Sequence, residues 1–317
     1  MNLAVRIAAA ILSVPPDVLA PFVPMLAPSP RNGLEIELRN EVDSALSGSC
    51  CRSSSSSGND EPLFAISREE AHYVDCKSGL PSTSMEEGLF NSDEMSEPPS
   101  TYGEITSLGA RQIFHYMGLM NDAISYNNDS KYQFFDLGSG GGRLVIQSYL
   151  ELPSVYKSVG IELSPSRHKI AIQTWTNLVE NGDALRIRKL AEKSWGRHYV
   201  HSIDDHAIES GVELHEGDLF YLDISQATHL YISSLCFSED MLVRIVEKIE
   251  REGVALQIVA SLRLLPFVDD RGSEHLSSKR VRLGRNPWME YVEMSWTKAR
   301  GDGCRVYLYT VTNVEDV

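Results

Sequence analysis

The chain has 317 residues, 42% of them apolar, and a formal net charge of −15. A chain of this length can bury one large core or two smaller ones. Because no long basic tract offsets the acidic balance, the sequence gives no strong signal for direct binding to nucleic-acid phosphates. The acidity is concentrated early: residues 35–104 hold 15 acids and 4 bases, whereas residues 105–317 hold 28 acids and 23 bases.

The cysteines and histidines indicate the redox compartment and whether a metal site is expected. The five cysteines, at positions 50, 51, 76, 236 and 304, are odd in number and show no paired metal-ligand spacing. This usage favours a reduced, intracellular compartment. The nine histidines form no H-E-x-x-H or similar pattern, so we expect no metal.

Residues 1–95 are expected to form a poorly structured, acidic N-terminal arm. They lack the strand and helix alternation found later, and the serine run at 53–57 cannot bury enough surface to offset its ordering entropy. The apolar start, residues 1–12, is too short for a membrane span and predicts either a cleaved targeting peptide or a short helix. We therefore expect one domain over 96–317, with the arm dispensable for folding.

After residue 104, strand and helix patterns alternate, which predicts a mainly parallel sheet with right-handed crossovers. The last two strand-like runs flank a glycine-containing turn and predict an antiparallel hairpin. A charged insertion precedes the third strand. The expected helices are 105–119, 143–150, 165–180 and 238–252, and the expected strands are 132–135, 156–162, 211–215, 227–233, 255–261, 288–296 and 304–312.

A glycine-rich loop follows the first of these strands. Glycine tolerates positive φ angles and lets a ligand approach the backbone. A dinucleotide site requires G-x-G-x-x-G, but Gly138, Gly140 and Gly142 stand two apart, and Arg143 takes the place of the third spaced glycine. With Asp136 just before it, the loop resembles the acidic-x-G-x-G-x-G loop of class I S-adenosylmethionine-dependent methyltransferases. That cofactor has no phosphate, and its ammonium group suits a nearby acid.

Two further acids end later strands. Glu162 closes the second strand about 20 residues after the glycines, which is the placement for holding ribose hydroxyls. Asp218 follows the third strand, where the class I enzymes hold the adenine amino group. Because the carboxyl ends of parallel strands meet in one crevice, these acids and the glycine loop are expected to form one cofactor site.

A narrower resemblance covers roughly residues 96–312. The stretch Tyr102-Gly103-Glu104 resembles the Tyr-Gly-Glu cofactor loop of the disruptor of telomeric silencing family, the non-SET lysine methyltransferases that modify the nucleosome core. The segments that match this family in order and approximate spacing are 136–140, 160–162, 217–219, 235–238, 291–295 and 306–310. The resemblance implies a Rossmann-like class I fold with a seven-stranded sheet whose last strand is antiparallel.

The resemblance also implies the cofactor contacts. Tyr102 and Glu104 would close over S-adenosylmethionine, and Asp136 with the glycines would hold its amino-acid end. Arg143 stands where the family has a glutamine, so it puts a positive charge beside the sulfonium unless it turns outward. The implied cofactor-binding residues are Tyr102, Gly103, Glu104, Asp136, Gly138, Ser139, Gly140, Gly142, Arg143, Glu162, Asp218 and Leu219.

On the acceptor side, the sequence departs from the family. In the family, two asparagines follow the fourth strand, and one of them faces the substrate lysine. This chain has Ser233-Ser234 in their place. A hydroxyl has a shorter reach and fewer hydrogen-bonding groups than an amide. The family also lines its lysine channel with aromatic residues, for which Phe237, Trp296 and Tyr307 are the candidates, with Val306 as an alternative to Tyr307. The expected catalytic residues are Ser233, Ser234, Phe237 and Tyr307.

The leading functional expectation is a nuclear protein-lysine methyltransferase acting on a nucleosome or histone. Since the sulfonium is already a strong methyl donor, the site need only position the amine. The basic cluster 279–285, in an expected loop, would either contact the nucleosome or an acidic peptide or remain solvated. One alternative is a cytoplasmic or organellar methyltransferase acting on a small molecule or a non-histone protein, and another is a non-catalytic cofactor-binding module.

Overall fold

A computed structural model of the chain describes residues 28–48, 104–120, 132–195, 205–266, 279–295, 297 and 303–314. The structural statements below concern these residues. Three residues singled out from the sequence, Tyr102, Gly103 and Trp296, lie outside them, as do most of residues 1–95.

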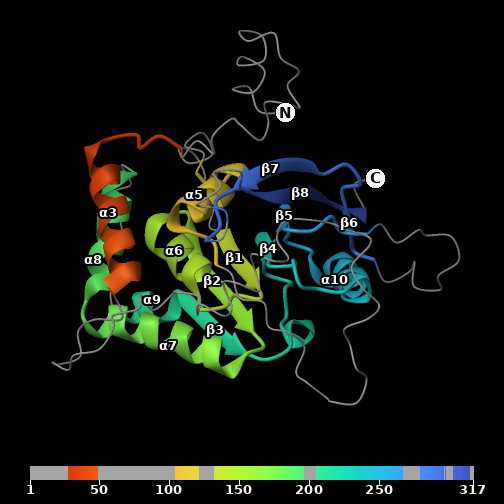
Figure 1. Ribbon diagram of the computed structural model, residues 1–317, viewed down its shortest axis with the longest axis horizontal. Helices are drawn as coiled ribbons and strands as arrows, with labels where there is room; N and C mark the ends of the chain where they lie inside the picture. The colour runs from red at the N-terminus through yellow and green to blue at the C-terminus, as the bar shows by residue number, and fades with distance from the viewer. Residues whose placement is uncertain are drawn as a thin grey trace, which may run out of the picture.

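Eight strands form one sheet in the order β3-β2-β1-β4-β5-β8-β6, and β7 also pairs with β8 (Figure 1). Strands β1 to β5 pair in parallel, while β8 runs antiparallel to β5 and to β7. This order and these directions confirm the expected Rossmann-like class I methyltransferase fold class. The bounds are β1 Tyr132–Leu137, β2 Val155–Glu162, β3 Val212–Glu216, β4 His229–Ile232, β5 Ile258–Ser261, β6 Val281–Leu283, β7 Trp288–Val292 and β8 Cys304–Asn313.

The sheet has one more strand than the seven expected. β7 pairs with residues 304–308 of β8, and β6 pairs with residues 311–313 of the same strand. The two short strands therefore share a single edge position. The segment 279–285 was expected to be a loop, but part of it is strand β6. Its side chains alternate as in a strand: Val281 and Leu283 are buried, and Arg282 is exposed.

Helices cover both faces of the sheet (Figure 1). α5 packs with β1, β4 and β8 in one apolar core cluster, and α6 and α7 lie in a second cluster on the same face, over β3. α10 lies in a third cluster, on the opposite face. The helix bounds are α3 Gly33–Gly48, α5 Ser107–Tyr116, α6 Arg143–Glu151, α7 Pro165–Glu180, α8 Asp183–Ser194, α9 Asp205–Ser210 and α10 Glu239–Glu252, with a 3-10 turn η2 at Leu219–Tyr221.

Local sequence explains where these helices begin and which face they bury. Thr106 and Ser238 cap α5 and α10 by accepting hydrogen bonds from the backbone N–H groups of Gly109 and Met241. α10 buries an apolar stripe at helical spacing, which turns that face toward the sheet. The stripe consists of Leu242, Ile245, Val246 and Ile249.

Helix α3 corrects the expectation of a poorly structured arm over residues 1–95. It buries Leu38, Val42 and Leu46 in the same cluster as α6, α7 and α8. The charged insertion before β3 also differs from expectation, because it forms α8 and α9, and α8 packs directly on α3 and α6 (Figure 1). Residues 33–48 therefore belong to the core of the domain.

Candidate active site

The glycine loop between β1 and α6 is held tightly against β2. The backbone N–H groups of Gly138 and Ser139 both donate to the carbonyl of Ile161, at 2.9 and 3.0 Å. Gly138, Gly140 and Gly142 all have positive φ angles of 87°, 55° and 82°, which residues with a Cβ rarely adopt. The positive φ angles thus explain why glycine stands at these three positions of the loop.

Glu162, at the end of β2, anchors the loop from the side. Its Oε2 accepts a hydrogen bond from Gly140 N–H at 2.9 Å, and its Oε1 accepts from Ser164 N–H at 2.8 Å. Arg167 on α7 also donates to Oε1, from Nε at 3.0 Å and from Nη2 at 2.7 Å. The acid expected to hold ribose hydroxyls is therefore in the expected place, and it already carries an ion pair.

Asp136, at the end of β1, is buried without a partner for Oδ1 among the described residues. Burial raises the pKa of this carboxyl well above its usual range, and the nearby charges of Glu162 and Glu104 raise it further. A buried acid flanked by two more acids is unfavourable unless a donor or a cation completes the site. The chemistry of this cluster therefore calls for a positively charged ligand.

Glu104 joins the cluster from a distant part of the sequence. Residues 104 and 105 run beside 294 and 295: Ser295 N–H donates to the Glu104 carbonyl at 2.8 Å, and Ile105 bridges Met294. Burial raises the pKa of the Glu104 carboxyl to about 7, against the opposing effects of Arg143 and of a hydrogen bond from the Gly141 N–H. Glu104 thus lies against the glycine loop, as the resemblance implies.

Arg143, the residue directly after the glycine loop, pairs with Glu104 and with the start of α5. Its Nε lies 3.6 Å from Glu104 Oε2, and its Nη1 donates to Ser107 Oγ at 3.2 Å. The positive charge is therefore directed toward Glu104 and the first turn of α5.

Asp218 and Leu219 lie beside Glu162, because Gly217 N–H donates to the Glu162 carbonyl at 3.0 Å. The Asp218 carboxylate caps η2 by accepting from Phe220 N–H at 3.0 Å. The Leu219 side chain is buried in the core on the α10 face. On α10, Lys248 donates to the Phe220 carbonyl at 3.2 Å and so fixes the position of this turn.

The loop after β4 meets the glycine loop. A Cβ built on Gly138 would lie 3.4 Å from Ser233 Cβ and 3.7 Å from the Phe237 ring. Tyr307 pairs with Ser261 at the end of β5, and its side chain packs against the same core cluster as Phe237. Val306, the alternative, is fully buried in the opposite cluster. Phe237 and Tyr307 therefore pack on the same face of the sheet, and Ser233 lies beside Gly138 at the same end of the sheet.

Ser234 does not fit the role expected for it. Its side chain is fully buried, and its Oγ lies 2.8 Å from Ser261 Oγ and accepts a hydrogen bond from Arg263 N–H at 2.9 Å. Period-2 alternation puts Ser233 and Ser234 on opposite sides of the chain. Ser234 therefore ties the ends of β4 and β5 together and does not face a substrate.

Two arginines of the site were not singled out from the sequence. Arg167 contacts Glu162, and Arg263 donates to the Phe237 carbonyl and to Glu239. For Arg167 a signal existed, since it lies in the first turn of the helix that follows the acid-bearing strand. Arg263 gave no such signal, because its partners follow a different strand.

Within the described ranges, no group of three or more His, Cys, Asp or Glu side chains is arranged to hold a metal ion. In the same ranges, no helix combines the length and the apolar character needed to cross a bilayer.

No protein-family model matches the chain, and neither does any curated protein. Solved structures with a similar fold include the RNA methyltransferase of Salinibacter ruber in complex with S-adenosyl-L-homocysteine, which shares 20% identity with a TM-score of 0.31; the match covers 62% of this chain and 89% of that one. TrmK of M. capricolum with the same cofactor product shares 11% identity over 62% of this chain and 68% of that one, with a TM-score of 0.32.

The rRNA methyltransferase aviRa of Streptomyces viridochromogenes shares 11% identity with a TM-score of 0.35, over 67% of this chain and 87% of that one. Similarities at this level do not identify a family or an activity. The fold class assigned to this chain therefore rests on the strand order and strand directions described above.

Proposed function

We propose that the protein is an S-adenosylmethionine-dependent methyltransferase. The observation that carries this proposal is buried Asp136, whose Oδ1 has no partner among the described residues and which lies near Glu104 and Glu162. A cofactor with an ammonium and a sulfonium group would supply the positive charge that this cluster lacks. A dinucleotide would instead bring a pyrophosphate against three acids.

Each part of the cofactor has a candidate partner in the chain. Asp136 and the glycine loop would hold the amino-acid end, Glu162 the ribose hydroxyls, and Asp218 the adenine amino group. Since Glu162 Oε1 already accepts three hydrogen bonds, the ribose would bind mainly at Oε2 or displace part of the Arg167 contact. When bound, the cofactor supplies an activated methyl group, and the chain contributes orientation.

For the acceptor, we propose a small molecule or a protein other than a core histone. The chain departs from the histone-modifying family where Ser233-Ser234 replaces the asparagine pair, and the burial of Ser234 leaves Ser233 as the hydroxyl of the pair beside Gly138. A single hydroxyl can hold a small or loosely constrained nucleophile, but it replaces little of an amide's hydrogen bonding. The second candidate, a histone lysine, is favoured by Glu104, which lies against the glycine loop as that family's Tyr-Gly-Glu segment implies.

Two experiments test these proposals in order. Calorimetry should detect binding of S-adenosylmethionine and its demethylated product but not of NAD; tight NAD binding would contradict the cofactor assignment. Incubation with radiolabelled S-adenosylmethionine and, separately, a metabolite extract, mixed soluble proteins, RNA, free histones and nucleosomes should then label an acceptor in one of the first two arms. Labelling confined to histones or nucleosomes would establish the second candidate, and labelling confined to RNA would overturn both.

A further inference from the structure

The polar contacts of Arg143 continue through neighbouring side chains as far as α3. Its first contact, Ser107, also accepts a hydrogen bond at its backbone carbonyl from Gln147 Nε2 at 3.0 Å. The same Nε2 group lies 3.2 Å from Glu151 Oε1. Gln147 and Glu151 are both buried on α6, so Arg143, Ser107, Gln147 and Glu151 form one continuous polar chain inside the domain.

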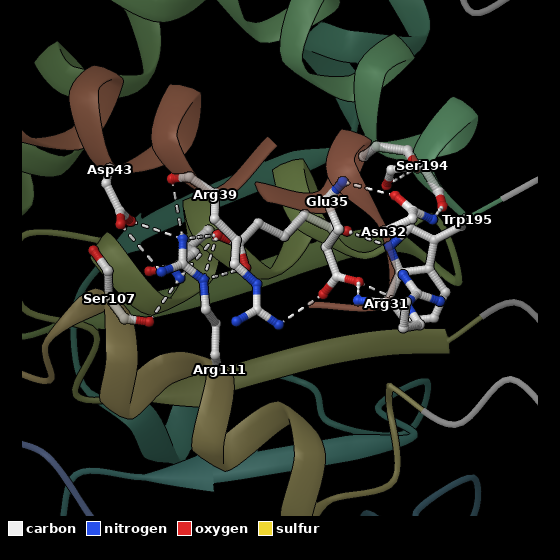
Figure 2. A network of polar contacts seen from close by, with 12 residues as sticks. Arg31, Asn32, Glu35, Arg39, Asp43, Ser107, Arg111, Ser194 and Trp195 are labelled. Carbon is white, nitrogen blue, oxygen red and sulfur yellow. Dashed lines mark hydrogen bonds and ion pairs between the residues drawn. The ribbon is translucent and has the colours of Figure 1, made fainter. Parts of the chain in front are cut away.

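Arg111 on α5 joins this chain to α3 (Figure 2). Its buried guanidinium donates from Nε to both oxygens of Glu151, at 3.0 and 3.2 Å. The other side of the guanidinium donates to Asp43 on α3, from Nη2 to Oδ1 at 2.7 Å and from Nη1 to Oδ2 at 3.2 Å, and Nη2 also reaches the Arg39 carbonyl at 3.3 Å. Such paired contacts are geometrically specific, so a displaced α3 would change the orientation of Arg111.

The start of α3 is fixed independently (Figure 2). Asn32 Nδ2 donates to the Ser194 carbonyl at 3.0 Å, and the Arg31 guanidinium lies 3.4 Å from the centre of the Trp195 ring. Trp195 in turn donates to the Glu151 carbonyl at 3.2 Å. The start of α3 and Asp43 in its second half therefore both lead to Glu151.

The charge on α3 also acts on Arg143 over a longer range. Burial lowers the pKa of Arg143, whereas the negative charges of Glu104 and Asp43 raise it. Asp43, on α3, thus favours the charged form of Arg143 together with Glu104, which lies against the glycine loop.

We propose that α3 is a positioning element of the cofactor site: Asp43, acting through Arg111 and the α6 polar chain, holds Arg143 in its contacts with Glu104 and Ser107, so that its positive charge is paired at the edge of the site. This inference rests on the proposed function. With Asp43 neutralised, these contacts loosen and the Arg143 charge is less well paired, so the guanidinium repels a cation bound at the site more strongly. The repulsion falls on S-adenosylmethionine, whose sulfur is positively charged, more than on S-adenosylhomocysteine, whose sulfur is neutral.

The test is calorimetry of both ligands with the full-length chain. Asp43→Asn should weaken S-adenosylmethionine binding about three- to tenfold and S-adenosylhomocysteine binding about twofold or less, since the Asp43 side chain is partly exposed and its charge is partly screened. Asp43→Glu keeps the charge and should restore the ratio of the two affinities. The matched control is Arg186→Gln, which breaks an exposed α3–α8 ion pair of 2.8 Å with Glu41 that does not touch the Arg111 chain.

A change in the affinity ratio for Asp43→Asn but not for Arg186→Gln supports the inference, because a general loosening of α3 would weaken both ligands alike. Equal weakening of both ligands, or equal ratios in the two variants, would overturn it and leave the proposed function intact. If the wild-type chain binds neither ligand, the proposed function fails and this inference fails with it.

Discussion

At the scale of single residues, the site is defined by buried acids that lack enough positive charge. Asp136, Glu104 and Glu162 are each at most 9% exposed. Arg143 and Arg167 pair with two of the three. The third, Asp136, is the residue whose burial is hardest to explain by folding alone.

Asp136→Asn should separate stability from binding. The amide removes a buried carboxyl that lacks a partner, so the free energy of unfolding should be unchanged or higher. Cofactor binding should weaken about ten- to a hundredfold, since a hydrogen bond to a charged group contributes roughly 1.5–3 kcal/mol. Urea denaturation and calorimetry measure the two effects. Glu213→Gln, on the exposed edge of neighbouring β3, is the control; equal cofactor affinity in all three proteins would remove Asp136 from the site.

Glu104 predicts a pH dependence near neutrality. Its pKa is raised from 4.5 to about 7 by burial, with Arg143 and Arg167 opposing and Asp136 as a neighbouring acid. Between pH 4.5 and about 7 the folded state therefore holds a proton that the unfolded state has lost, so this group makes stability fall as pH rises through that window and level off above it. A cationic cofactor favours the ionised carboxyl. The dissociation constant of the cofactor should therefore fall about tenfold between pH 6 and pH 8.

Glu104→Gln is the check on this profile. The variant cannot ionise at this position, so the step in affinity near pH 7 should disappear while any step from other groups remains. Calorimetry of S-adenosylhomocysteine at several pH values measures it, and an unchanged step would assign the titration to another group.

At the scale of elements, α8 stabilises the end of α6. Arg188 is buried, and its guanidinium donates to four backbone carbonyls at and beyond the last turn of α6. Helix ends leave such carbonyls without partners, and a buried one is costly. The acceptors are the carbonyls of Tyr149, Leu152, Pro153 and Val155.

Arg188→Met should therefore lower the free energy of unfolding by about 3–5 kcal/mol, the range for breaking a buried charged network. The neighbouring Lys189 is exposed, so Lys189→Met should change it by about 0.5 kcal/mol or less. Guanidinium denaturation of both variants measures the difference. Similar stabilities would mean that water replaces the guanidinium at these carbonyls.

At the scale of the whole molecule, the folded domain extends to the helix at residues 33–48. α3 contributes three fully or almost fully buried apolar side chains to the cluster shared with α6 and α8. Truncating Leu38 or Leu46 to alanine should lower the free energy of unfolding by about 2–5 kcal/mol each. The sum is comparable to the total stability of a typical domain, about 5–15 kcal/mol.

Two apolar positions on α3, two residues apart, test this directly. Leu38 is 2% exposed and Ile36 is 50% exposed. Leu38→Asp buries a charge and should lower the free energy of unfolding by at least about 3 kcal/mol, whereas Ile36→Asp should change it by less than about 1 kcal/mol. Thermal or urea unfolding measures both. A chain that starts at Glu94 should likewise fail to fold stably; equal tolerance of both substitutions would restore the expectation of a dispensable arm.

The sequence by itself determined the order of the elements and the acids at the strand ends. α7 spans Pro165–Glu180 as expected, and Gly138, Asp136 and Glu162 lie together, because glycine spacing, apolar alternation and strand-end position are local properties. The antiparallel hairpin at the end is also local, since two strand patterns flank one short turn.

Only the tertiary structure decided which residues at these places are partners. Ser233 and Ser234 look alike in sequence, and the pairing of β4 with β5 buries one and leaves the other beside the glycine loop. Residues 33–48 were expected to belong to a poorly structured arm, and their helix packs on α6 and α8, which begin 95 or more residues after it ends. Contacts across such distances depend on how whole elements pack, and no local pattern in the chain encodes that packing.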